Sequence, residues 1–220
     1  MKSVGGLKIA EKIEEWADPS RTALLVYDMQ AGICSQVECS DVMSAMKRVL
    51  AAARAAGMRV VFTRHLSLPK PWMGRMAWRT AMAWQHTDDP DAVKPWFLRD
   101  IPGFQIVPEL APTADEVVFD KLAMSAFEGT PLEMTLRDCG IEALAIVGIA
   151  TEIGIEPTVR HAADLGIVPI VITDACGHGD ADAAARAIEQ MRFIGDAVLT
   201  DAAAFARALG SPRPGRSTRS

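Results

Sequence analysis

The chain of 220 residues lacks the features that mark several classes of protein. Its net charge is −5 and no basic stripe is interleaved with aromatic residues, so we expect no nucleic-acid partner. No apolar run approaches the roughly 20 residues that a bilayer-spanning helix needs, and no membrane partner is expected. The four cysteines form no CxxC pair and no signal peptide is recognisable. Together these absences favour the cytoplasm over a disulfide-stapled secreted domain.

Motifs for cofactors and metals are also missing. No GxGxxG, Walker loop or GxSxG occurs, so nucleotide binding and a serine triad have little support. His65 and His86 belong to no HxH, Asp-x-His or HExxH arrangement. The sequence therefore predicts neither a cofactor nor a metal site.

Apolar strand-like runs alternate with helical patterns along most of the chain. Continuous β-branched runs indicate strands that are covered on both faces, and short strand–helix connections indicate right-handed crossovers. The sequence predicts an α/β fold, a three-layer α/β/α sandwich around a six-stranded, mainly parallel, Rossmann-like sheet. The predicted strands are 23–27, 59–63, 116–119, 144–147, 168–172 and 197–199, and the predicted helices are 42–56, 132–139, 156–165 and 180–193.

Composition divides the chain into one domain with two appendages. The alternating pattern occupies residues 21–210, after an N-terminal extension at 1–20. The Pro/Gly-rich polar tail at 211–220 is expected to be disordered.

An aromatic-rich excursion at 66–104 interrupts the alternation and is too long for an ordinary connection. Either it builds a local core or a subunit contact, or it is a lid that gives aromatic walls to a crevice. Its apolar content also favours a homo-oligomer, a dimer or a tetramer. The excursion contains Trp72, Trp78, Trp84 and Trp96.

The predicted topology selects candidate functional residues, because ligands bind beyond the carboxyl ends of strands in such sheets. Asp28 follows the first strand, Arg64 and His65 follow the second, and Lys121 follows the third. The turn at 148–154 follows the fourth strand.

Three of these positions suggest chemistry, each with a plainer alternative. Asp28, if partly desolvated, can have a raised pKa and exchange protons near neutrality; otherwise it is a turn or capping residue. Lys121 can pair with a carboxylate and stabilise negative charge, or it is a surface lysine. The amides of the turn that ends at Gly154 can form an oxyanion site, or Gly154 is a turn glycine with positive φ.

Taken together, the order and spacing of these segments resemble the isochorismatase-like hydrolases, also called the cysteine hydrolase superfamily, over roughly residues 21–209. The resemblance implies hydrolysis of a small-molecule substrate, with Asp28 and Lys121 as catalytic residues. It also implies a cis peptide between Ile149 and Ala150. The matching segments are 23–30, 121–133, 148–151, 164–166 and 173–176.

The chain departs from part of this family at Gly154. Amidase members place a cysteine there and use an Asp–Lys–Cys triad. Members that hydrolyse the vinyl ether of isochorismate commonly carry glycine, and their aspartate acts as an acid while water completes the reaction. The resemblance thus implies a cysteine-independent hydrolase, with Asp28 as general acid/base and Gly154 in the catalytic turn.

Further site residues follow from this interpretation. The backbone at Ile149, Ala150 and Ile153 is expected to hold a substrate oxygen. The tryptophans suit a cyclic substrate, and an arginine (Arg64, Arg75 or Arg79) can bind a carboxylate on it. The expected substrate-binding residues are Gln30, Arg64, His65, Trp72, Trp78, Trp84, Phe127 and Thr151.

Two alternatives stay open. One is hydrolysis of an amide or related C–N bond in the same pocket, by water that Asp28 activates or by a displaced thiol of Cys34 or Cys176. The other is a non-catalytic binding protein, although a binder has no need of the Asp28 and Lys121 pair.

Overall fold

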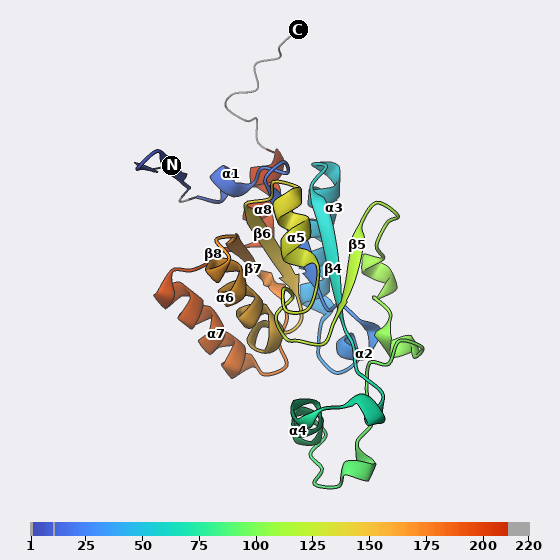
Figure 1. Cartoon of the computed structure of the whole chain (residues 1–220). Helices are drawn as coiled ribbons and strands as arrows, with labels where there is room; N and C mark the ends of the chain where they lie inside the picture. Colours follow the sequence, from blue (N-terminus) through green and yellow to red (C-terminus); the bar gives the residue numbers. More distant parts are fainter. Residues whose placement is uncertain (1, 11, 211–220) are drawn as a thin grey trace.

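The computed structural model describes residues 2–10 and 12–210, and a six-stranded parallel sheet lies at its centre (Figure 1). The strands are β3 (Thr22–Tyr27), β4 (Arg59–His65), β5 (Val117–Lys121), β6 (Ala143–Gly148), β7 (Val168–Cys176) and β8 (Val198–Thr200). Their order across the sheet is β5-β4-β3-β6-β7-β8, and every ladder is parallel. The first strand of this sheet, β3, lies in the middle; β4 and β5 then extend the sheet to one edge, and β6, β7 and β8 extend it to the other. The predicted fold class is confirmed.

Helices cover both faces of this sheet (Figure 1). The α-helices of the described chain are α1 (Ile13–Trp16), α2 (Ala31–Cys34), α3 (Ser40–Ala55), α4 (Arg75–Trp84), α5 (Leu132–Asp138), α6 (Glu156–Asp164), α7 (Ala181–Ile194) and α8 (Ala202–Gly210). Short helical turns are η1 (Lys70–Trp72), η2 (Pro90–Ala92), η3 (Pro102–Phe104), η4 (Pro108–Leu110) and the π-type η5 (Thr151–Ile155). The pattern-based prediction did not include α8.

Two hydrophobic cores flank the sheet because successive strand residues point to opposite faces. Leu24 and Val26 of β3 pack with residues of α3 and α8. Leu25 and Tyr27 of the same strand pack with residues of α5, α6 and α7. Burial on both faces explains why the strands are continuous apolar runs rather than alternating ones.

Two segments extend from this sandwich. Near the N-terminus, β1 (Lys2–Val4) and β2 (Leu7–Ile9) form an antiparallel hairpin. The excursion at 66–104 carries α4 away from the carboxyl end of the sheet, at the bottom of the view (Figure 1). The predicted disordered tail at 211–220 lies outside the described residues. In the described part of the chain, no helix is long and apolar enough to cross a membrane.

The packing of α8 leads to a stability prediction. Phe205 is fully buried in the core between α8 and the sheet, whereas Phe193 on α7 is 85% exposed. Phe205→Ala should lower the free energy of unfolding by about 3–5 kcal/mol, because it removes a large buried side chain and leaves a cavity. The matched control Phe193→Ala should change it by less than about 0.5 kcal/mol. Urea unfolding measures both, and equal effects would contradict the assigned core.

Candidate active site

The site begins where adjacent strands end. Asp28 directly follows β3, and His65 and Lys121 are the last residues of β4 and β5. The ladder places His65 beside Lys121, and Tyr27 beside Gly148 at the end of β6. Asp28 has a φ of 48°, a left-handed conformation that Asp tolerates better than most residues and that ends the strand abruptly. The parallel topology thus gathers residues that are far apart in sequence.

Asp28 and Lys121 form a buried ion pair. The distance from Lys121 Nζ to Asp28 Oδ2 is 2.6 Å, and both side chains are almost wholly buried. The other carboxylate oxygen, Oδ1, accepts a hydrogen bond from Thr63 Oγ1 at 2.7 Å. Thr63 Oγ1 in turn accepts from the Asp28 amide at 3.3 Å, so the carboxylate is fixed from two sides.

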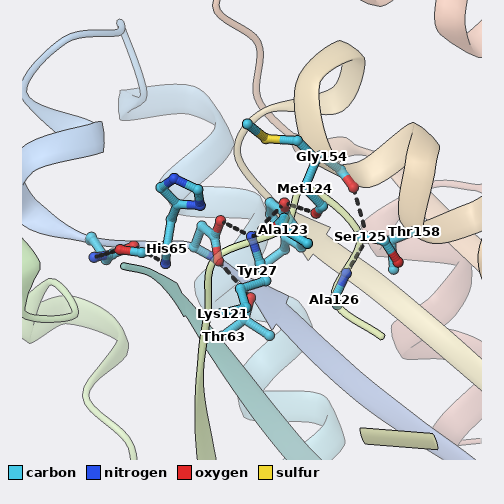
Figure 2. Close-up of polar contacts among 12 residues, drawn as sticks. Tyr27, Thr63, His65, Lys121, Ala123, Met124, Ser125, Ala126, Gly154 and Thr158 are labelled. Atoms are coloured by element: carbon cyan, nitrogen blue, oxygen red, sulfur yellow. Dashed lines mark hydrogen bonds and ion pairs between the residues drawn. The ribbon is translucent and has the colours of Figure 1, made fainter. Parts of the chain in front are cut away.

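Lys121 uses all three of its ammonium protons (Figure 2). Besides Asp28, it donates to the Tyr27 hydroxyl at 2.8 Å and to the Ala123 carbonyl at 3.1 Å. Burial lowers the pKa of Lys121, and the charge and hydrogen bond of Asp28 oppose that shift. The ammonium is therefore held in one place by the carboxylate, a phenol and a backbone carbonyl.

The turn after β6 completes the wall of the site. The Ile149–Ala150 peptide is cis, as the resemblance predicted. Gly148 has a φ of 135°, and a Cβ there would lie 2.1 Å from the Tyr27 carbonyl oxygen, so only glycine fits. Thr151 lies close to this turn but donates both its amide and its hydroxyl to the Gly177 carbonyl. It therefore stabilises the loop rather than facing a ligand.

The amides expected to form an oxyanion site are only partly available. Ile149 donates to the Tyr27 carbonyl and Gly154 donates to the Ala150 carbonyl, at 3.1 and 3.0 Å. Within residues 2–10 and 12–210, the amides of Ala150 and Ile153 have no hydrogen-bond acceptor. Ala150 and Ile153 both line the cavity, and they are the better donors for a substrate oxygen.

A cavity of about 590 Å³ opens in front of Asp28. Its walls are mainly apolar and aromatic, and they come from both sides of the strand ends and from the excursion. The residues that line it are Tyr27, Asp28, Ile33, Gln36, Val37, His65, Ala83, Trp84, His86, Trp96, Phe97, Met124, Ile149, Ala150, Ile153, Gly179 and Asp180. The excursion therefore supplies aromatic walls, which is the lid interpretation of this segment.

Several expected substrate contacts lie elsewhere. Gln30 donates to the carbonyls of His65 and Phe104 and accepts from the His65 amide, so it ties backbone segments together. Phe127 is buried in the core on the α5–α7 face and does not line the cavity. Trp72 is 77% exposed, and Trp78 contacts Lys70, with the ammonium 5.9 Å from the ring centroid.

Arg64 also does not reach the cavity. Its guanidinium pairs with Asp120 at 2.8 Å and stacks over Phe104 at 4.3 Å. No lysine or arginine is among the described residues that line the cavity, including Arg75 and Arg79. The expected arginine contact to a substrate carboxylate is thus absent from the lining.

Other lining residues were not singled out from the sequence. Ile33 and Val37 come from α2 and the turn after it, and Phe97 and Met124 come from loops. Loop positions carry no periodicity, so no sequence pattern could have placed them. Tyr27 could have been found, because it is the only tyrosine and directly precedes Asp28.

Comparisons with known proteins identify the family of the chain. The isochorismatase domain model matches residues 22–203. The chain belongs to the isochorismatase family of hydrolases. It is 32% identical to a ureidoacrylate amidohydrolase of Serratia proteamaculans, covering 71% of this chain and 70% of the relative. A ureidoacrylate amidohydrolase of Methylobacterium radiotolerans is 30% identical, covering 94% and 87%. A cysteine hydrolase from Pseudomonas syringae pv. phaseolicola superposes with a TM-score of 0.76 at 25% identity, covering 87% and 93%.

Neither candidate thiol of this isochorismatase-family hydrolase lines the cavity. Cys176 is buried in the core, and burial raises its pKa well above the ordinary value. Burial and the neighbouring Cys39 raise the pKa of Cys34 to about 12. Both thiols stay protonated at neutral pH, so a displaced nucleophile receives no support from their positions.

His65 gives a pH-dependent prediction. Burial, with the Lys121 charge as a second cause, lowers its pKa from 6.5 to about 4. Between these pH values the unfolded chain binds more protons than the folded one. Stability should therefore fall by up to about 3 kcal/mol as the pH falls from 6.5 to 4.

His65→Phe should remove this part of the pH dependence and keep a ring against Phe97, whose centroid lies 5.8 Å from that of His65. Urea unfolding at several pH values measures the slope. The same substitution at exposed His178 is the control and should leave the slope unchanged. A His65→Phe protein with the parent slope would contradict the assigned shift.

Proposed function

We propose that this protein is a cysteine-independent hydrolase in which Asp28 activates water against an acyl C–N bond of a small cyclic molecule. The observation that carries the proposal is the buried Asp28–Lys121 pair, which faces a cavity beside a position, Gly154, that offers no nucleophile. The names of the amidohydrolase relatives support the bond class.

The hydrogen bonds of Asp28 suggest the order of proton transfer. Each carboxylate oxygen accepts one bond within the protein and keeps a further lone pair, and Asp28 lines the cavity. Because the Lys121 ammonium and the Thr63 hydroxyl both donate to this side chain, we infer that Asp28 acts first as a proton acceptor. This order is the reverse of a mechanism in which a protonated Asp28 opens the reaction.

The proposed reaction balances without a covalent enzyme intermediate. Asp28 takes a proton from water while the water oxygen bonds to the acyl carbon, and the free amides of Ala150 and Ile153 hold the oxyanion. Asp28 then returns the proton to the leaving nitrogen as the C–N bond breaks. The products are a carboxylic or carbamic acid and an amine.

The cavity walls suggest the body of the substrate. Trp84, Trp96 and Phe97 provide flat apolar surfaces, which suit a ring. Because no lysine or arginine of the described chain lines the cavity, we infer a substrate without a carboxylate.

A second candidate is hydrolysis of a vinyl ether with Asp28 as the acid. The glycine at position 154 favours it, since isochorismate-cleaving members resemble the chain there. Turnover of isochorismate, but not of neutral cyclic amides and ureas, would select this candidate over the first. The opposite result would support C–N hydrolysis. A homodimer or homotetramer and a cytoplasmic location stay predictions.

Replacement of the base tests the mechanism. Asp28→Asn should lower kcat on a neutral cyclic amide by at least about 100-fold, because it removes the group that accepts the proton. The buried Lys121 charge then lacks its counter-ion, so the variant should also be less stable, by up to about 3 kcal/mol.

The double variant Asp28→Asn/Lys121→Met is the matched control, since it removes both charges. It should recover stability without recovering turnover. Activity of Asp28→Asn above a few percent of the parent would remove Asp28 from the mechanism.

Alkylation tests the absence of a thiol from the reaction. Iodoacetamide treatment should leave kcat within about twofold of the untreated enzyme, because neither the partly buried Cys34 nor the buried Cys176 lines the cavity. Cys34→Ser and Cys176→Ser variants, assayed in parallel, locate any effect. Inactivation that one of these variants abolishes would return a cysteine to the mechanism.

A further inference from the structure

The backbone conformation at position 154 does not explain why a glycine stands there. Gly154 lies in η5 with an ordinary helical conformation, and its φ is not among the positive values of the chain. Any amino acid can adopt such a backbone. A Cβ at this position would lie 1.9 Å from the Tyr27 hydroxyl oxygen, 2.3 Å from Cζ and 2.6 Å from Cε1. The obstacle to a side chain is therefore the phenol of Tyr27.

Tyr27 cannot easily move aside. Tyr27 is 2% exposed, and its ring is packed in the core on the α5–α7 face. The hydroxyl donates a short hydrogen bond to the Met124 carbonyl and accepts one from Lys121 at 2.8 Å. The Lys121 ammonium also lies 4.3 Å from the centroid of the Tyr27 ring. The phenol is thus held by two hydrogen bonds at its hydroxyl (Figure 2) and by the packing of its ring in the core.

We propose that Tyr27 is a positioning residue that takes the space of a side chain at position 154 and uses it to hold the Lys121 ammonium against Asp28. The steric part of this inference stands on the structure alone, and its catalytic part rests on the proposed function. Tyr27 and Gly154 then form one coupled pair: the phenol is possible only beside glycine, and a thiol at 154 is possible only without the phenol.

The hydroxyl is suited to holding a cation rather than to attacking a substrate. Burial and the Asp28 charge raise the pKa of Tyr27 well above its usual value, so the phenol keeps its proton. That proton is donated to Met124, and a lone pair faces Lys121. Loss of the hydroxyl would leave one buried ammonium proton without an acceptor, which disfavours the charged form of Lys121.

A stability experiment tests the coupling and needs no substrate. Gly154→Ala should lower Tm by roughly 5 °C or more in the parent protein, because its Cβ overlaps the phenol. In a Tyr27→Val background the same change should leave Tm equal or higher, since alanine suits a helix better than glycine. Gly74→Ala, with no atom within 4 Å of the added Cβ, is the control for glycine replacement.

The background Tyr27→Phe separates ring from hydroxyl. The ring atoms Cζ and Cε1 alone obstruct the new Cβ, so Gly154→Ala should still lower Tm there. A Gly154→Ala protein as stable as the parent would overturn the steric inference, even if Tyr27→Val does not fold. An equal penalty in the tyrosine and valine backgrounds would do the same.

A pH profile tests the catalytic part. Tyr27→Phe should lower kcat about tenfold with KM within about twofold, because the ammonium loses a hydrogen-bond acceptor and is held less firmly against Asp28. The alkaline loss of kcat should begin at a lower pH than in the parent, since removal of that acceptor lowers the Lys121 pKa further. An unshifted profile would overturn the positioning role and leave the steric coupling intact. Absence of any hydrolysis by the parent protein would instead contradict the proposed function.

Discussion

The buried ammonium of Lys121 is the constraint on which the site depends. Removal of such a charge from water costs several kcal/mol, and the structure offsets this cost with an ion pair and two further acceptors. Two of the acceptors, Tyr27 and Asp28, come from the end of β3, and the third, Ala123, comes from the loop after β5. The ammonium therefore joins segments that are separated by the whole of β4. Every proton on it is committed, so Lys121 has none left to donate to a ligand, whereas the Asp28 carboxylate lines the cavity and keeps lone pairs of its own.

The register of the strands decides which residues at the strand ends face the site. Neighbouring strand residues point to opposite faces, and the ladder pairs Arg64 with Asp120 and His65 with Lys121. One pair forms a salt bridge away from the cavity, and the other pair belongs to the site. The sequence shows only that both Arg64 and His65 end a strand. Which of them faces the ligand depends on register, and register depends on long-range pairing that no local pattern contains.

A feature could be predicted from the sequence where its signal lies within a short stretch of the chain. Apolar runs and the glycines that end helices are local signals, so the six strands could be predicted from the sequence. The alternation of strands with helices predicted their parallel arrangement, and the strand ends gave the positions of Asp28 and Lys121. The aromatic excursion was recognisable by composition, yet its tryptophans separate in space: Trp84 and Trp96 line the cavity while Trp72 faces solvent. The chain of this excursion follows an irregular path, and its turns show no helical or strand periodicity. Composition could thus identify the segment but could not show which of its residues line the cavity.

Gly154 shows most clearly why a residue type alone does not reveal its cause. A glycine after a strand favours a turn with positive φ, and that interpretation holds for Gly148 but not for Gly154. At 154 the cause is a side chain 127 positions earlier, whose hydroxyl occupies the space that a Cβ would need. The space beside Gly154 is therefore filled, and the phenol that fills it accepts a hydrogen bond from Lys121. A cysteine introduced at 154 alone would displace the group that holds Lys121, and the same substitution that supplied a thiol would disturb the cation beside it. A change from the present arrangement to one with a thiol at position 154 would therefore need substitutions at both position 154 and position 27.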